Sequence, residues 1–334
     1  MLWWSLQKLK SKDKWARFDA AKKIGQEGDP EGVVPLIAVA TKDESKDVRR
    51  AAMHSLGLLG DQRATRPLLS VLRGKDPELR EAAARALSKL GVPAVEQLVA
   101  ALRDPDNDVK QASAEALGLV GAAAVRPLSQ ALDSDDKDVR RTAAYALGLI
   151  GDVRSIEVLV SALKDEDRQG RQHIVKALGR IRSGRIVEPI VSALTDIDFD
   201  VRQAAASELG EIKTPEAVGA LVTALTDNVD VVRVAAAEAL GKIGDGRAVS
   251  ALIEVLETEH QMVAANALQR MLERPNARIG IEELKKLAAL PPTMQYRVLV
   301  TDGTGSVTVR EGVVDCTNLR AAAHKATTRR GVVA

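Results

Sequence analysis

The sequence predicts an all-α protein, a right-handed α-solenoid of stacked helix pairs (an α/α superhelix), with a small C-terminal β-hairpin extension. Two observations predict the solenoid. A segment of about 31 residues recurs along most of the chain, and each copy holds two stretches with the apolar spacing of a helix. A third observation, a change to strand-like patterning after residue 290, predicts the hairpin.

One basic residue marks the register of the repeat and recurs at spacings of 30 to 32 residues: Arg17, Arg49, Arg80, Lys110, Arg140, Arg171, Arg202 and Arg233. The residue directly before it in the second helix of each copy is called the lead residue. Seven positions after the basic residue comes an aliphatic residue and then a glycine, with Ser88 as the exception. A ninth copy, around residues 262–268, keeps the apolar pattern without the arginine and the glycine. One copy could not bury its own apolar face, so neighbouring copies must stack.

The second helix of each pair is represented by "DVRRAAMHSLGLLGD", residues 47–61. On a helical wheel, four small or apolar residues share the face of the lead residue Val48: Ala51, Ala52, Ser55 and Leu56. We predict Asp47 as the N-cap and Gly60 as the left-handed residue that ends the helix. The arginine of each copy lies at the edge of the buried face. We predict that its guanidinium reaches an aspartate in an adjacent turn, as a structural ladder.

The first helix of each pair is represented by "RATRPLLSVLRG" and "AAVRPLSQALDS". Pro67, Pro127 and Pro189 stand near its start, where a missing amide hydrogen costs least. The repeats predict a solenoid of about nine copies over residues 1–273, followed by a capping helix over residues 274–290.

The remaining segment, residues 291–334, predicts a hairpin and a basic tail. "QYRVLV" and "SVTVREGVV" have the pattern of strands around the loop "TDGTG", giving a hairpin over residues 295–314. Because an isolated hairpin is marginal in water, it should pack on the last repeat or complete a sheet in a partner, which would be a tail-mediated association. "TNLRAAAHKATTRRGVVA" holds a short helix before a basic end.

The run "DVRRAAxxALGLIGD" followed by "RAVxPLIxAL" resembles the HEAT-like repeats of the phycobilin lyase (PBS lyase) family, over residues 1 to about 273. The resemblance implies an armadillo-like α-solenoid. It is less specific for function, because the family includes chromophore lyases, a metal-dependent hydroxylase and plain interaction scaffolds.

Composition excludes several classes of protein. Forty-eight Lys and Arg residues nearly balance 46 Asp and Glu residues, and a formal charge of +2 gives no general attraction to nucleic acid. Cys316 is the only cysteine, which excludes an intramolecular disulfide framework. The chain has no secretory signal pattern and no uncharged apolar run long enough to span a bilayer. We therefore expect a soluble, cytoplasmic protein.

Positions two and six after the lead residue point away from the core of the second helix. Position two holds Phe18, Arg50, Glu81, Gln111, Arg141, Gln172, Gln203, Val234 and Met262, and position six holds Lys22, His54, Arg85, Glu115, Tyr145, Lys176, Ser207, Glu238 and Asn266. In such solenoids the second helices line the concave side, so the two columns form one stripe. The stripe is either an ordinary solvated face or a partner-binding groove. From its central part we predict seven partner-binding residues: Arg50, His54, Arg85, Arg141, Tyr145, Gln172 and Lys176.

Candidate metal sites fail on detail. "DPDNDVKQASAE" places Asp104, Asp106, Asp108 and Glu115 in calcium-loop positions, but Val109 replaces the required glycine, which favours an acidic turn between helices. The hydroxylase of the family would need His-Glu dipeptides, and none of the four histidines is followed by glutamate.

The other candidate catalytic groups also lack partners. Glu257 and His260 are two ligands alone, and Cys316 has no partner motif. His173 replaces a small residue on the buried face, so we expect a hydrogen-bonded core or interface histidine there. We predict no catalytic residue, metal or cofactor.

Two binding surfaces remain to be weighed. A nucleic-acid solenoid would need a basic track with stacking aromatics, but aromatic residues are 2% of the chain. At the N-terminus, Trp3, Trp4 and nearby lysines have the composition of a membrane-interface segment. The same residues align with residues 67–76 as the first helix of the first repeat, which favours a polar end cap over a weak membrane contact.

We expect a non-catalytic scaffold that binds a protein partner in the concave groove, without nucleic acid and without an integral membrane segment. The alternative, which depends on the family resemblance, is a phycobilin-lyase-like chromophore lyase or accessory subunit, or another protein-modifying enzyme of the HEAT-like family.

Overall fold

The computed structural model of the protein describes residues 2–165, 167–256, 258, 260–273, 279–301 and 307–329. The chain divides into two compact units, unit 1 (Met1–Arg182) and unit 2 (Ser183–Ala334). Both are built from helix pairs, and among the described residues strands occur only near the C-terminus. The prediction of an all-α solenoid is confirmed.

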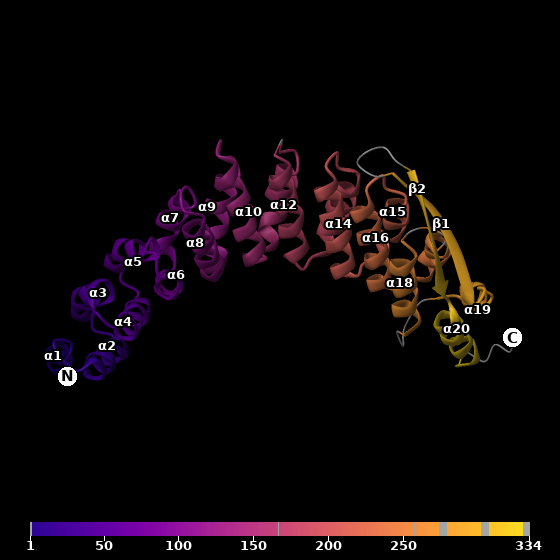
Figure 1. Ribbon diagram of the computed structural model, residues 1–334. Coiled ribbons are helices and arrows are strands. Elements are labelled where there is room, and N and C mark those ends of the chain that lie inside the picture. The colour runs from indigo at the N-terminus through magenta and orange to yellow at the C-terminus, as the bar shows by residue number, and fades with distance from the viewer. Residues whose placement is uncertain are drawn as a thin grey trace. The chain divides into compact units, whose positions relative to one another are not determined.

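Unit 1 has two rows of helices (Figure 1). The first helices of its pairs are α1 (Leu2–Lys8), α3 (Val33–Lys42), α5 (Thr65–Leu72), α7 (Val92–Ala101), α9 (Val125–Ala131) and α11 (Ile156–Ala162). The second helices are α2 (Lys14–Glu27), α4 (Lys46–Leu59), α6 (Pro77–Leu90), α8 (Asn107–Val120), α10 (Lys137–Ile150) and α12 (Arg168–Arg180). Each second helix packs against the first helix of its own pair, and from α2 to α12 each second helix of unit 1 packs against its neighbour in the row. The second helices therefore form one continuous row.

The buried face of the second helices follows the predicted wheel. In α4, Val48, Ala52, Ser55 and Leu56 are fully buried, and the Ser55 hydroxyl donates to the Ala21 carbonyl oxygen at 2.8 Å. The serine thus satisfies its buried hydroxyl on the preceding repeat, which joins two copies as well as filling space.

The start of the second helix lies two residues earlier than predicted. The N-cap is the residue three positions before the lead residue, and in most repeats it is an aspartate whose side chain accepts from the first turn: Asp13, Asp76, Asp106, Asp136, Asp167 and Asp198. In α4 this position is Ser45, so the prediction of Asp47 as N-cap was wrong. Acidic residues at both positions favour the helix N-terminus, and the pattern alone did not separate the cap from the first turn.

The helix ends follow the predictions more closely. Gly60 has φ 67° at the end of α4, in the left-handed region. Pro67, Pro127 and Pro189 are each the third residue of a first helix, where no intrahelical donor is lost.

At several positions the repeated arginine joins one repeat to the next. Arg17 donates to Asp43 at 2.8 and 3.0 Å, Arg140 to Asp165 at 2.6 and 2.9 Å, and Arg202 to Asp227 at 2.7 and 2.9 Å. Each of these guanidinium groups also donates to a backbone carbonyl six residues earlier. The predicted arginine–aspartate ladder is confirmed at these positions.

Repeated glycines allow neighbouring second helices to approach closely. A Cβ atom added at Gly148 would lie 2.8 Å from the Cα atom of Ala177 in the next repeat, and one added at Gly210 would lie 2.8 Å from the Cα atom of Ala239. Both contacts are with backbone, which cannot move aside cheaply, so glycine and a facing alanine set the helix separation.

Unit 2 continues the same arrangement. Its first helices are α13 (Val187–Ser192), α15 (Val218–Ala224), α17 (Val249–Val255) and α19 (Ile281–Ala288), and its second helices are α14 (Phe199–Ile212), α16 (Asp230–Ile243), α18 (Gln261–Glu273) and α20 (Thr317–Arg329). The second helices pack in the order α14, α16, α18 and α20. The first part of the predicted capping helix, residues 274–278, lies outside the described residues.

The last helix pair is interrupted in sequence. α19 packs on α17 as a first helix would, and α20 packs on both α18 and α19 as a second helix would. Between them the chain forms strands β1 (Thr293–Thr301) and β2 (Val307–Asp315), which pair antiparallel (Figure 1). We predicted a short helix and a basic tail after the strands, but α20 has 13 residues and buries Leu319 and Ala323. It completes a further pair of the array.

Candidate functional site

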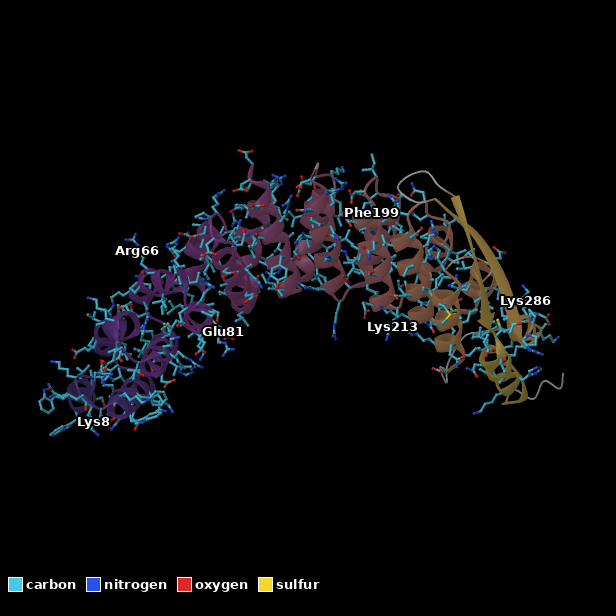
Figure 2. The ribbon with its side chains drawn as sticks, viewed as in Figure 1. Lys8, Arg66, Glu81, Phe199, Lys213 and Lys286 are labelled. Carbon is cyan, nitrogen blue, oxygen red and sulfur yellow. The ribbon has the colours of Figure 1, made fainter. Side chains whose placement is uncertain are left out.

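The seven predicted site residues all lie on the second helices of unit 1. Arg50 and His54 are on α4, Arg85 is on α6, Arg141 and Tyr145 are on α10, and Gln172 and Lys176 are on α12. Figure 2 shows the two sides of this unit: Glu81 lies on the side of the second helices, and Arg66 of α5 lies on the opposite side.

Three of these residues line a groove across α2, α4 and α6, here called the basic groove. It has a volume of about 730 Å³ and is lined by Phe18, Lys22, Asp47, Arg50, Ala51, His54, Ala82, Arg85, Ala86 and Lys89. Four of the lining side chains are cationic and one is acidic. The alanines and Phe18 supply apolar floor between the charges, so the groove suits an anionic ligand with an apolar body.

The two arginines of the basic groove are held loosely. The Arg50 guanidinium lies 3.5 Å from the Glu78 carboxylate, and both side chains are more than half exposed. Arg85 pairs with Glu81, one turn away on the same helix. Exposed pairs of this kind contribute little to stability, so both arginines can turn toward a ligand at low cost.

His54 lies between two lysines of the groove. Its Nε2 is 3.0 Å from the Lys89 Nζ. Burial lowers the pKa of His54, and the charges of Lys89 and Lys22 lower it further. The imidazole is therefore neutral near pH 7 and accepts a hydrogen bond from the Lys89 ammonium.

A second hollow, here called the polar pocket, lies on α8, α10 and α12. It has a volume of about 470 Å³ and is lined by Asn107, Lys110, Gln111, Asp138, Arg141, Thr142, Tyr145 and His173. The Lys110 Nζ donates to Asp138 at 3.0 Å. The His173 Nδ1 donates to the Gln169 carbonyl oxygen at 2.7 Å, so the predicted hydrogen bond is present, but the side chain is half-buried and lines the pocket instead of the core.

Arg141 is a correction to the sequence analysis, which placed it in the solvent-facing stripe. Its Nε and Nη2 donate to the two carboxylate oxygens of Asp167 at 2.6 Å each, and its side chain is only 18% exposed. Asp167 also accepts from the Gly170 amide at 2.7 Å as the cap of α12. A wheel drawn for one helix cannot show that the next repeat places a carboxylate over this face, so Arg141 is a structural bridge.

Tyr145 belongs to a contact that sequence reasoning missed. The Arg180 guanidinium of the next repeat lies 5.1 Å from the centroid of its ring. Arg180 stands ten positions after the lead residue, as Lys89 does, and Lys89 likewise reaches back to position six of the preceding repeat. Position ten is one helical turn beyond position six, so the same wheel could have predicted a third column of the surface. Gln172 is half-buried and Lys176 is exposed, and neither lines these two hollows.

The candidate metal and nucleophile sites do not assemble. Asp104 accepts from Arg73 at 2.8 Å and Asp108 from Arg80 at 2.9 Å, so the acidic turn binds arginines of the preceding repeat. Among the described residues no group of three or more His, Cys, Asp or Glu side chains is placed to hold a metal ion. Glu257 lies outside the described residues. Cys316 is buried, and burial raises the pKa of its thiol.

In the part of the chain that the structure describes, no helix combines the length and apolar character needed to cross a membrane.

The chain matches the family of HEAT repeats over residues 4–88, 33–118, 95–179, 156–238 and 187–273. It is 37% identical over 76 residues to the bilin biosynthesis protein PecE of Mastigocladus laminosus, a match that covers 23% of this chain and 28% of that protein. The PecE protein of a Nostoc species is 38% identical over 76 residues, 23% of this chain and 30% of that protein. The chain thus spans less than a third of the length of these relatives.

Among solved structures, the Kap95:Nup1 complex has a TM-score of 0.51 at 15% identity, covering 86% of this chain and 47% of that chain. Yeast importin-beta has a TM-score of 0.50 at 14% identity with the same coverage. These likenesses show the fold alone. With the family match over most of the chain, the chain belongs to the HEAT repeat family, and 76 of its residues are similar to a bilin biosynthesis protein.

Proposed function

We propose that this protein has a phycobilin-lyase-related role, in which the basic groove of unit 1 binds an open-chain tetrapyrrole. The observation that carries the proposal is the 37% identity to a bilin biosynthesis protein over 76 residues. The match covers a minority of both chains, so the lining of the groove must separately be compared with the chemical groups of a bilin.

The basic groove has the groups that a bilin requires. An open-chain tetrapyrrole carries two propionate carboxylates on a long conjugated body, and arginine and lysine are the usual partners of carboxylates. Arg50, Arg85 and Lys89 supply the cations, and Phe18 with the groove's alanines supplies apolar surface. Its volume of about 730 Å³ lies within the roughly 300–1,000 Å³ usual for small-molecule sites.

The lining groups of the basic groove indicate binding and presentation of a ligand. They hold no cysteine, serine or tyrosine that could act as a nucleophile, and Asp47 is the one carboxylate among them. The neutral His54 accepts a hydrogen bond from Lys89 and can orient that ammonium toward a propionate. Any bond-forming step would then use groups on a partner protein that receives the pigment.

An absorbance titration with a bilin tests this function, because a conjugated tetrapyrrole changes its spectrum when its conformation is fixed. We expect a saturable spectral shift with the full chain. The double change Arg50→Ala and Lys89→Ala should weaken binding at least about tenfold, since each removes a charge-assisted hydrogen bond. The matched control is Arg66→Ala with Lys75→Ala, two exposed cations away from the groove, which should bind as the unchanged protein does. A titration with no spectral shift would refute the bilin role.

A second candidate is a non-catalytic scaffold that binds a protein partner along the second helices. Tyr145 under Arg180 and the exposed Lys176 favour it, because tyrosine and arginine are the types most often found at binding hot spots. An affinity pull-down with mass spectrometry would identify the partner. The double change Tyr145→Ala and Lys176→Ala should then weaken binding by about 2 kcal/mol with little change in Tm. Ser129→Ala with Gln130→Ala, on the first helix α9, is the control.

A further inference from the structure

All three tryptophans of the chain lie within its first fifteen residues, and none is buried. Trp3, Trp4 and Trp15 are 61%, 66% and 56% exposed. The other exposed large apolar side chains of unit 1 are aliphatic and spread along the chain: Val34, Leu58, Val92, Leu119, Leu149 and Val153. Large aromatic side chains left in water, gathered in one short segment, indicate a surface that binds something.

The packing of the first repeat does not need these tryptophans. α1 packs on α2, and Ser5 and Leu9 are buried. The end-cap prediction therefore accounts for the leucine and the serine but not for Trp3 and Trp4. α1 and α2 form the first pair of unit 1 (Figure 1).

The charges beside the tryptophans select the partner. Residues 2–15 hold four exposed lysines, Lys8, Lys10, Lys12 and Lys14, and a single acidic residue. That residue, Asp13, accepts from the Trp15 amide at 3.0 Å as the N-cap of α2. The segment thus has a net positive charge of three, and its lysines flank amphipathic rings. Tryptophan with lysine is the composition of segments that lie at the surface of anionic bilayers.

The ring geometry favours a lipid surface over single-stranded nucleic acid. The Trp3 and Trp4 rings meet edge to face, with centroids 4.8 Å apart and planes at 82°. Trp15 and Phe18 also meet edge to face, at 5.9 Å and 78°. Bases stack on faces that lie open and roughly parallel along a track, whereas perpendicular rings make a compact wedge that can enter the headgroup layer.

We propose that Trp3, Trp4 and Trp15 with Lys8, Lys10, Lys12 and Lys14 form a docking surface for anionic lipid membranes at the N-terminal end of unit 1. The rings enter the interfacial layer and the ammonium groups contact lipid phosphates and carboxylates. The contact is peripheral and independent of the bilin role proposed above.

Intrinsic fluorescence tests this surface directly, because every tryptophan of the chain belongs to it. The full-length protein is mixed with vesicles of phosphatidylcholine alone or with about one third phosphatidylglycerol. We expect a blue shift of the emission and co-sedimentation with the anionic vesicles, both decreasing in high salt. Trp3→Ala with Trp4→Ala, and Lys8→Glu with Lys10→Glu and Lys12→Glu, should each weaken co-sedimentation at least about tenfold.

The matched control reverses three other exposed lysines, Lys42, Lys75 and Lys164, to glutamate. This variant should bind anionic vesicles as the unchanged protein does, and circular dichroism should show all variants folded. No blue shift on anionic vesicles overturns the proposal, as does equal loss of binding in the control. Self-association that Trp3→Ala with Trp4→Ala abolishes without vesicles would assign the surface to a second copy. A shift seen with single-stranded nucleic acid and not with vesicles would assign it to that ligand.

Discussion

At the residue scale, Arg140 and Arg141 show that the neighbouring repeat determines the environment of a side chain. The two side chains are adjacent in sequence, and each binds a different aspartate before α12, Asp165 and Asp167. Both bridges are bidentate and mostly shielded from water. Removing either arginine leaves a partly buried carboxylate without its main partner, which is the costly half of such a change.

Arg141→Ala should therefore lower the free energy of unfolding by about 1–3 kcal/mol, as Arg140→Ala should. The measurement is chemical denaturation of each variant. Arg154→Ala is the control, because Arg154 pairs with Asp152 two residues away in its own turn and is well exposed. That variant should change little, and a loss at Arg141 no larger than at Arg154 would contradict the bridge.

The same bridge predicts a pH dependence. The hydrogen bonds from Arg141 lower the pKa of Asp167 from 3.8 to about 2. A carboxyl whose pKa is lower in the folded state stabilises the fold above its unfolded pKa, and the effect is lost as the pH falls through the folded value. We expect stability to decline between about pH 4 and pH 2, and less steeply in Arg141→Ala. Equal slopes in the two proteins, from Tm measured against pH, would contradict this.

At this scale the sequence predicts what one helix contains and misses what the next repeat adds. The buried face of α4 and the arginine ladder follow from periodicity, because both repeat with the copy. Asp167 over Arg141, Lys89 beside His54 and Arg180 over Tyr145 are contacts between copies. Asp167 stands at the recurring N-cap position and Lys89 and Arg180 at position ten, but a wheel drawn for one helix does not show which residue of the next copy faces it.

At the element scale, the spacing of the second helices depends on glycine residues, which have no side chain. Gly148→Ala would place a methyl group against the Cα of Ala177, so α10 and α12 must separate. We expect a loss of about 1–3 kcal/mol in the free energy of unfolding. Gly219→Ala in α15 meets no atom within 4 Å and should instead be neutral or stabilise by about 0.5–1 kcal/mol. Urea denaturation of both variants would show whether the close approach is the cause.

The last helix pair was predicted in part. The sequence indicated strands after residue 290, and it also held a signal for α20 that went unused. "NLRAAA", residues 318–323, matches "DVRRAA" at residues 47–52, with Leu319 in the place of the lead residue and Arg320 in that of the repeated arginine. The strands place 26 residues between the end of α19 and Asp315, before α20 begins. This copy of the second helix therefore lies outside the 31-residue register, and the sequence analysis interpreted it as a tail.

At the scale of the whole molecule, an array of equivalent pairs should tolerate loss of a whole repeat. Deleting residues 109–138 joins Asp108 to Val139, which keeps the register and the alternation of first and second helices. We expect a folded protein whose denaturant slope falls by about a tenth, in proportion to chain length. Deleting α8 alone, Asn107–Val120, breaks the alternation and should unfold the protein. Circular dichroism with urea titration distinguishes them, and two equally folded deletions would contradict the alternation.

The interrupted last pair offers a site where another sequence can be inserted. The chain leaves the array after α19 and returns at α20, and the two helices pack on each other without the strands between them. Whatever occupies that gap is tethered at both ends, which restricts its movement beside the array and leaves the repeat pattern unchanged. A fluorescent protein or an epitope grafted in place of residues 293–315 should therefore leave α19 and α20 paired, and its movement would be more restricted than that of a fusion attached at one end.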